Sequence, residues 1–185
     1  MQNATTRSLP VAGGQILKLS LAVCLLTLSA KTTVPFFPVP MTMHVMATLL
    51  LAGLGGLRFG ALSLLSYLAV GAAGMPVFTG TPEKGIGLAY MVGPTGGYLA
   101  GFLVAAVLVG WAVDRFGRRA VWWAMPVALG LVYALGLAWL SRFVPSDKLL
   151  ALGLMPFVLG DLLKVAMAAL LTTLAPARLT RWIRG

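Results

Sequence analysis

The chain has 185 residues, of which 59% are hydrophobic and only 10% are charged, and its mean hydropathy is +0.95. A soluble domain of this size needs far more polar surface, so the composition nearly excludes a soluble globular fold. The formal net charge is +10, but the basic residues are scattered between long apolar runs and form no stripe, so nucleic acid is not a predicted partner.

Charges, prolines and glycines divide the sequence into six apolar runs, and a membrane-spanning helix needs about 20 mostly apolar residues. The first span is predicted at about 15–34. Three prolines within 35–40 end it, because proline removes a backbone donor and fixes φ. A shorter second span is predicted at about 41–54, and a third at 59–74 after a tight turn at Arg58.

A loop at 75–86, rich in glycine and proline, precedes the remaining runs. Three further spans are predicted at about 88–113, 120–140 and 156–174. No internal repeat is visible. The sequence therefore predicts a single all-α domain over residues 1–185, an integral membrane bundle of six helices embedded in the lipid bilayer.

Lysine and arginine are divided unequally between the two ends of this predicted bundle, and cytoplasmic loops carry an excess of these residues. If the N-terminus is cytoplasmic, four of the 14 basic residues lie outside, Lys164 lies within a span, and nine lie inside. The nine are Arg7, Lys18, Arg58, Arg115, Arg118, Arg119, Arg178, Arg181 and Arg184. The asymmetry predicts that both termini are cytoplasmic.

Residues for catalysis and metal binding are scarce, because the chain has one cysteine (Cys24), one histidine (His44) and four acidic residues. This composition excludes a disulfide framework, a cysteine-based zinc site and a histidine-rich metal centre. There is no GxxxxGK[ST] phosphate loop and no HExxH motif, so we predict neither ATP hydrolysis by this chain nor an intramembrane enzyme. No cofactor and no metal are predicted.

Asp161 and Lys164 are the charged pair within the last predicted span. An ionised side chain there costs at least about 2.5–3.5 kcal/mol on insertion scales, and the i, i+3 spacing places both on one helix face. The pair could be an ion pair that fixes helix packing. It could also be a polar site facing a cavity, which the preceding Pro156 and Gly160 favour.

Tyr98 follows a glycine-rich segment in which Gly93, Gly97 and Gly101 form two GxxxG spacings. Small residues at this spacing let helices approach closely, which is the expected role of the glycines. Tyr98 itself offers a ring for stacking and a hydroxyl for a hydrogen bond. Its spacing fits a cavity wall and an interfacial anchor equally well.

The outer loops supply the remaining candidates. Thr42 and His44 follow the proline-rich loop, where a lone histidine is more often a packed side chain than a ligand. Phe78 and Lys84 lie in the 75–86 loop. That loop is either a solvated connector or a lid over a site.

Four segments together resemble the BioY family, the biotin-binding substrate-specificity (S) component of energy-coupling factor (ECF) importers. They are PVPMT at 38–42, GMPVF at 74–78, GPTGGY at 93–98 and GDLLK at 160–164. The resemblance extends from Val34 to Ala175. It implies a six-helix protein of the bacterial inner membrane that crosses the membrane several times, binds biotin with high affinity near the outer face, and takes part in vitamin uptake.

The resemblance also implies partners, namely a membrane-coupling (T) subunit and ABC-type ATPase subunits that supply the energy. The alternative is a solitary biotin carrier or facilitator that works without ATPase partners. The lack of inverted repeats counts against an ion-coupled carrier.

For the site, the resemblance implies that Asp161 accepts an N–H of the biotin ureido ring and that Lys164 donates to its carbonyl, as their donor and acceptor types allow. In the alternative arrangement Lys164 pairs with the valerate carboxylate. In this alternative arrangement Lys84 has no ligand contact. In the first arrangement Lys84 holds the carboxylate. Tyr98 would flank the bicyclic ring, with Phe78 or Phe36 as an apolar wall. Thr42 and His44 complete the predicted ligand-binding set; His44 stands where a glutamine is common in the family.

Overall fold

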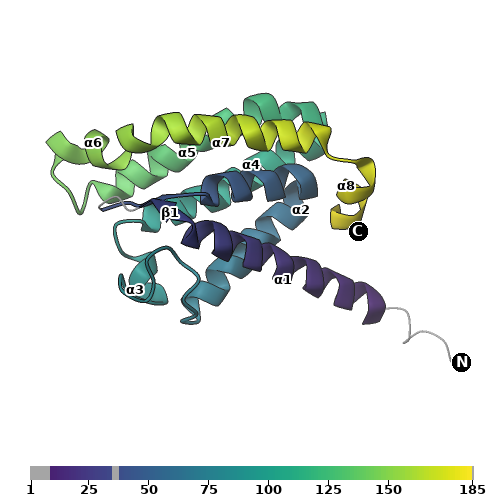
Figure 1. Ribbon diagram of the computed structural model, residues 1–185, viewed down its shortest axis with the longest axis horizontal. Helices are drawn as coiled ribbons and strands as arrows, with labels where there is room; N and C mark the ends of the chain where they lie inside the picture. The colour runs from purple at the N-terminus through teal and green to yellow at the C-terminus, as the bar shows by residue number, and fades with distance from the viewer. Residues whose placement is uncertain (1–8, 35–37, 185) are drawn as a thin grey trace, which may run out of the picture.

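The structure is a computed structural model that describes residues 9–34 and 38–184 (Figure 1). Helices dominate it, as the sequence predicts. The helices are α1 (Leu9–Lys31), α2 (His44–Ala72), α3 (Leu88–Met91), α4 (Gly96–Phe116), η1 (Arg118–Ala120), α5 (Val121–Leu140), η2 (Ser146–Lys148), α6 (Leu149–Gly153), α7 (Met155–Leu174) and α8 (Ala177–Arg184). Two short antiparallel strands, β1 (Thr33–Val34) and β2 (Met41–Thr42), pair Thr33 with Thr42.

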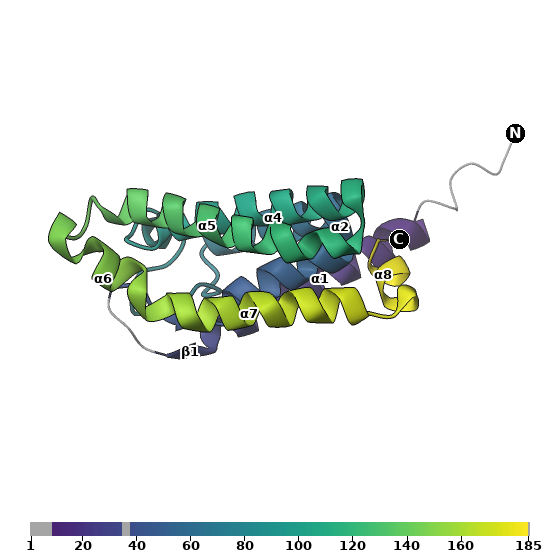
Figure 2. The same cartoon turned by 90° about the horizontal axis from the view of Figure 1, so that it is seen from above.

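Five helical segments of the described residues are long and apolar enough to cross a membrane. They are Gly13–Lys31, His44–Ala72, Gly96–Phe116, Arg118–Leu140 and Ser146–Leu174. The predicted span at 88–113 is divided into α3 and α4, because Gly93 and the ring of Pro94 interrupt the helix between them. In Figure 2, α7 runs along the long axis of the bundle beside α5, and α6 lies where the two connect.

The predicted second and third spans are joined in one element, α2, which leaves helical geometry at Gly56. This glycine has φ +76° and ψ −171°, a region that is essentially open only to glycine. The main-chain N–H of Leu57, which follows the break, donates to Asp114 Oδ2 at 2.8 Å. The first arm (44–55) and the second arm (57–72) diverge from this bend in Figure 1.

Glycines on α4 allow the central helices to touch. A Cβ at Gly101 would lie 2.8 Å from the Cα of Val132 on α5, and one at Gly110 would lie 2.6 Å from the Cα of Leu57. The close-packing role predicted for the GxxxG glycines is therefore confirmed at Gly101. Around this contact the core is filled by small and branched side chains, including Ala105, Val109 and Ala128.

Replacing Gly101 with alanine is expected to lower the free energy of unfolding by about 1–3 kcal/mol, because the new methyl group meets backbone that cannot move aside. The measurement is reversible unfolding in mixed detergent micelles. Gly130→Ala on α5 is the matched control, because nothing lies within 4 Å of the added Cβ. Equal stability of the two variants would contradict the proposed close contact.

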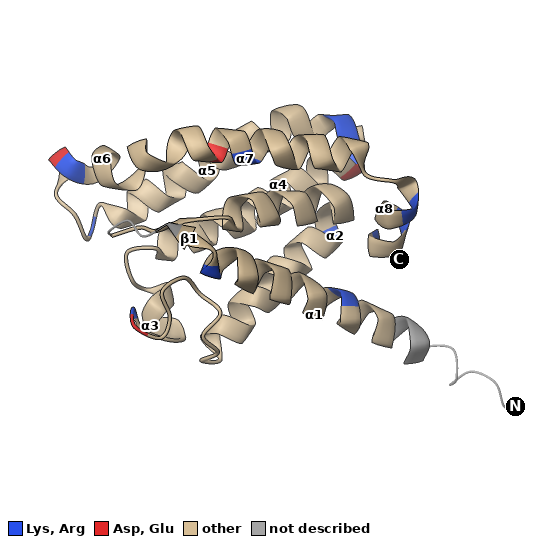
Figure 3. Ribbon diagram, in the orientation of Figure 1, with Lys and Arg blue, Asp and Glu red and all other residues tan. Residues whose placement is uncertain are grey.

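Basic residues gather near the end of α4 and along α8 (Figure 3). Lys18, Arg58 and Arg184 line one pocket there, and the Arg118 guanidinium donates to the carbonyl of Ala175. Eight of the nine residues predicted to be cytoplasmic are in the described part of the chain; Arg7 lies outside it. Near the other end of the bundle, Lys31 is the last residue of α1.

Candidate functional site

A narrow cavity of about 60 Å³ lies at the end of the bundle near the strands. Segments from distant parts of the sequence surround it: the end of α1, the β2 region, the first arm of α2, and the start of α4. Its lining residues are Ala30, Val39, Pro40, Thr42, His44, Tyr67, Thr79, Tyr90, Thr95, Tyr98, Leu99 and Phe102. Three of the predicted site residues, Thr42, His44 and Tyr98, are therefore brought together.

Asp161 and Lys164 form a buried ion pair on α7, with Lys164 Nζ 2.8 Å from Asp161 Oδ1. The residues are only 5% and 7% exposed. Lys164 Nζ also donates to the main-chain oxygen of Thr42 at 2.7 Å, and the Tyr133 hydroxyl on α5 donates to Asp161 Oδ2 at 2.7 Å. This polar chain, Tyr133–Asp161–Lys164–Thr42, crosses from α5 through α7 to β2.

The polar chain retains capacity for a ligand. Lysine has three N–H donors and a carboxylate accepts at about four positions, whereas Lys164 uses two donors and Asp161 accepts two bonds here. Neither Asp161 nor Lys164 lines the cavity, and Thr42, which does, connects the polar chain to it. Its hydroxyl also accepts the N–H of His44 at 3.2 Å, which holds the start of α2 beside β2.

His44 is 3% exposed and lies between two aromatic rings, 5.0 Å from Tyr67 and 4.7 Å from Phe102 between centroids. Its Nδ1 lies 3.3 Å from the carbonyl oxygen of Leu26. Its Nε2 has no hydrogen-bond partner among the described residues. Buried polar atoms are nearly always paired, so this ring nitrogen in the cavity wall has capacity for one further hydrogen bond.

Phe78 is fully buried behind the cavity wall and is absent from the lining. It stacks on Tyr90 at 4.9 Å and meets Tyr67 edge-on at 5.4 Å, so it supports two rings that do face the cavity. The Tyr98 hydroxyl donates to the carbonyl of Gly153 at 2.7 Å, which leaves its ring as the feature offered to a ligand.

The loop at 73–87 is hydrogen-bonded to the end of α1. Lys31 Nζ donates to the carbonyl oxygen and to the hydroxyl of Thr81 at 2.8 and 2.9 Å. The Thr79 hydroxyl donates to the carbonyl of Ala30 at 2.8 Å. Lys84, in the same loop, is exposed and does not line the cavity. The structure therefore does not bring Lys84 together with the other predicted residues.

Sequence reasoning missed Tyr133, which bonds Asp161 from another helix. The chain has four tyrosines, and three of them line the cavity while the fourth completes the polar chain. A hydroxyl in the middle of an apolar span was the available signal. Phe36, the alternative apolar wall, lies outside the described residues. No cluster of three or more His, Cys, Asp or Glu side chains capable of holding a metal occurs in 9–34 and 38–184.

Comparison with known proteins places these features in context. The model of the BioY family matches residues 2–181. The biotin transporter BioY of Thermotoga maritima is 38% identical over 159 residues, covering 85% of this chain and 92% of that protein. The probable biotin transporter BioY of Pyrococcus horikoshii is 36% identical over 153 residues, covering 82% of this chain and 90% of the relative.

A solved structure shares the fold. The crystal structure of the S-component for biotin from an ECF-type ABC transporter superposes with a TM-score of 0.74. The match covers 91% of this chain and 93% of the other, with 23% sequence identity.

Proposed function

The chain belongs to the BioY family, and from that premise we propose that it binds biotin and imports it as the S component of an ECF-type transporter. The relatives named as biotin transporters support this function, and it requires no catalysis by the chain. The observation that gives it the most support is the polar chain beside a small cavity lined by aromatic side chains. A ligand with both hydrogen-bonding and apolar parts fits that combination.

The proposed topology has six crossings in the bacterial inner membrane, with both termini in the cytoplasm. Each arm of α2 would then cross separately, with the bend at Gly56 as the cytoplasmic turn. The clustering of basic side chains around that bend and α8 supports this orientation. The cavity would then lie near the outer face, where a solute arrives.

In the proposed site, the neutral ureido ring of biotin faces Asp161 and Lys164. Asp161 accepts a ring N–H, and the third N–H of Lys164 donates to the ring carbonyl. The valerate carboxylate is placed away from this pair, because two carboxylates side by side disfavour each other's ionised form. The carboxylate then lies toward the 73–87 loop, where Lys31 and Lys84 supply positive charge.

The remaining candidates have defined roles in this proposal. The His44 Nε2 offers a hydrogen bond to the ligand, and the ring of Tyr98 forms one wall of the cavity. Phe78 backs Tyr67 and Tyr90. Because the open space of about 60 Å³ is small for a ligand pocket, the 73–87 loop moves as a lid when biotin enters.

Energy for import comes from partners, because the chain has no phosphate-binding loop for ATP. We propose a membrane-coupling (T) subunit and ABC-type ATPase subunits. The alternative is a solitary carrier, and biotin uptake in cells lacking all such subunits distinguishes the two. Uptake that continues unchanged without them would favour the solitary carrier.

The proposal predicts sub-micromolar biotin binding by the purified chain in detergent, measured by titration calorimetry. Tyr133→Phe is expected to lower the free energy of unfolding by about 1.5–3 kcal/mol, the contribution of a hydrogen bond to a charged group, and to weaken biotin binding because Asp161 loses the hydroxyl that orients it. Tyr98→Phe is the matched control: it removes a hydroxyl bonded to main chain and keeps the ring, so binding changes much less. No measurable biotin binding by the unmodified chain would refute the function.

A further inference from the structure

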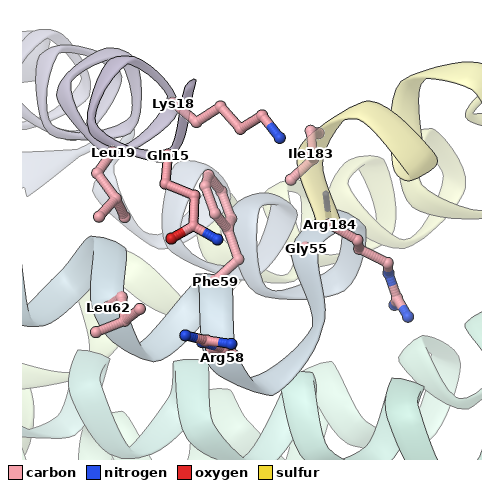
Figure 4. A pocket seen from close by; sticks show the side chains of 9 residues that line it. All are labelled: Gln15, Lys18, Leu19, Gly55, Arg58, Phe59, Leu62, Ile183 and Arg184. Atoms are coloured by element: carbon pink, nitrogen blue, oxygen red, sulfur yellow. The ribbon is translucent and has the colours of Figure 1, made fainter. Parts of the chain in front are cut away.

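A basic pocket lies at the opposite end of the bundle from the proposed biotin site. It is formed where α1, the bend of α2 and α8 meet, and it has an open volume of about 70 Å³. Figure 4 shows Lys18 and Arg58 on opposite sides of it, with the Gln15 amide and the Phe59 ring between them. The guanidinium of Arg184 points away from both in this view.

Among the residues that the structure describes, the positive charge of this pocket is only partly balanced by carboxylates. Arg184 is paired with Asp114, at 3.1 Å between Nη1 and Oδ1. Lys18 Nζ lies over the ring of Trp182, 5.4 Å from its centroid, and neither Lys18 nor Arg58 has a carboxylate partner among the described residues. Two cations and an amide are therefore available to an anion from outside the chain.

An apolar groove continues from the pocket between α1 and the second arm of α2. Its volume is about 720 Å³, and Leu19 belongs to both the pocket and the groove. The groove follows α1 from Ile16 to Leu28 and reaches Val70 and Val77. Ile16 and Leu28 are 65% and 66% exposed, so this wall faces the surroundings of the bundle.

We propose that the pocket and the groove together bind one anionic phospholipid. Its phosphate lies between Lys18 and Arg58, and an acyl chain follows the groove from Leu19 toward Val77. Guanidinium and ammonium groups match phosphate oxygens in charge and in hydrogen bonding, and basic pockets between membrane helices are suited to lipid headgroups. A free phosphate would fill the pocket alone; the adjoining groove favours a lipid.

Cys24 provides a direct reporter, because it is the single cysteine of the chain, is exposed and lines the groove. We expect phosphatidylglycerol, added to the purified protein in neutral detergent, to slow labelling of Cys24 by a maleimide. Phosphatidylcholine with the same acyl chains should protect much less. The same labelling is measured with inorganic phosphate and with detergent alone.

Substitution of the two cations tests the headgroup contact. In the double variant Lys18→Gln and Arg58→Gln, half of the maximal protection of Cys24 is expected at an about 30-fold higher phosphatidylglycerol concentration. Each single substitution should raise that concentration by about 5-fold. Arg119→Gln is the matched control, because Arg119 is exposed near the same end and lines a different pocket. Helical circular dichroism and the elution volume in detergent report folding of each variant.

Protection by phosphatidylglycerol that is lost stepwise in the single and double variants, and kept in Arg119→Gln, supports the site. Equal protection by phosphatidylcholine overturns it, as does equal loss in Arg119→Gln, which would reflect general attraction to the basic end. A free phosphate in the pocket would leave the groove open, so inorganic phosphate should not slow labelling of Cys24, and protection by phosphate equal to that by phosphatidylglycerol would overturn the lipid proposal.

Discussion

Asp161→Asn is expected to weaken biotin binding by about 100-fold or more, because a hydrogen bond to a charged group contributes up to about 3 kcal/mol. The same change should lower the free energy of unfolding by about 3–5 kcal/mol, since it leaves Lys164 as an uncompensated buried charge. The asparagine oxygen can still accept from Tyr133, so this part of the polar chain survives. Titration with biotin and reversible unfolding in detergent measure the two effects.

A double variant separates the two roles of the ion pair. Asp161→Asn combined with Lys164→Met removes both charges, and replacing a buried pair by neutral or apolar groups is often nearly neutral for stability. We therefore expect the stability to recover while biotin binding stays weak. If the double variant bound biotin as the unmodified chain does, the pair would serve helix packing alone.

Gly56→Ala is expected to lower the free energy of unfolding by about 2–6 kcal/mol, the sum of backbone strain and overpacking of about 1–3 kcal/mol each. The strain follows from the positive φ of +76°. The overpacking follows because the new Cβ would overlap the carboxylate of Asp114. That carboxylate cannot withdraw freely, since it holds Leu57 and Arg184.

Gly117→Ala is a control that separates the overpacking at Gly56 from the backbone strain. Gly117 has nearly the same backbone, φ +81° and ψ 173°, but nothing lies within 4 Å of the Cβ it would gain. It should therefore show the strain alone, about 1–3 kcal/mol. The measurement is again reversible unfolding in mixed micelles. Equal losses in the two variants would show that Asp114 does not constrain the bend.

The parts of the fold and site that were predictable from the sequence are those where local composition leaves few alternatives. Apolar runs between charges predict the helices, because the hydrocarbon core admits little else. Asp161 and Lys164 stood out because charge within a span is rare. Their placement together on α7 required only the helical repeat, and the structure has them bonded at 2.8 Å.

Other features depend on how helices are rotated against one another, which no local pattern specifies. The hydroxyl of Tyr133 within an apolar span is a local signal, but its partner is not, because the bond to Asp161 exists only where α5 and α7 present these faces to each other. Lys84 is basic and lies in the 73–87 loop, yet the path of that loop gives Lys31 rather than Lys84 a defined partner. Similarly, the glycines at 53–56 indicate a break in the helix, but Asp114, the residue that bonds to the chain at this break, lies on α4.

The contacts around the bend of α2 also constrain the order in which the molecule can be completed. Arg184 Nε donates to the carbonyl of Leu54 at 3.2 Å, across 130 positions of sequence, and its guanidinium shares Asp114 with Leu57. Chains are made and begin to fold from the N-terminus. The two arms of α2 are therefore synthesised long before the side chain that joins them. Until then, the carbonyl of Leu54 lacks a partner that it has in the finished bundle, so the contacts around the bend are complete only once α8 has been made.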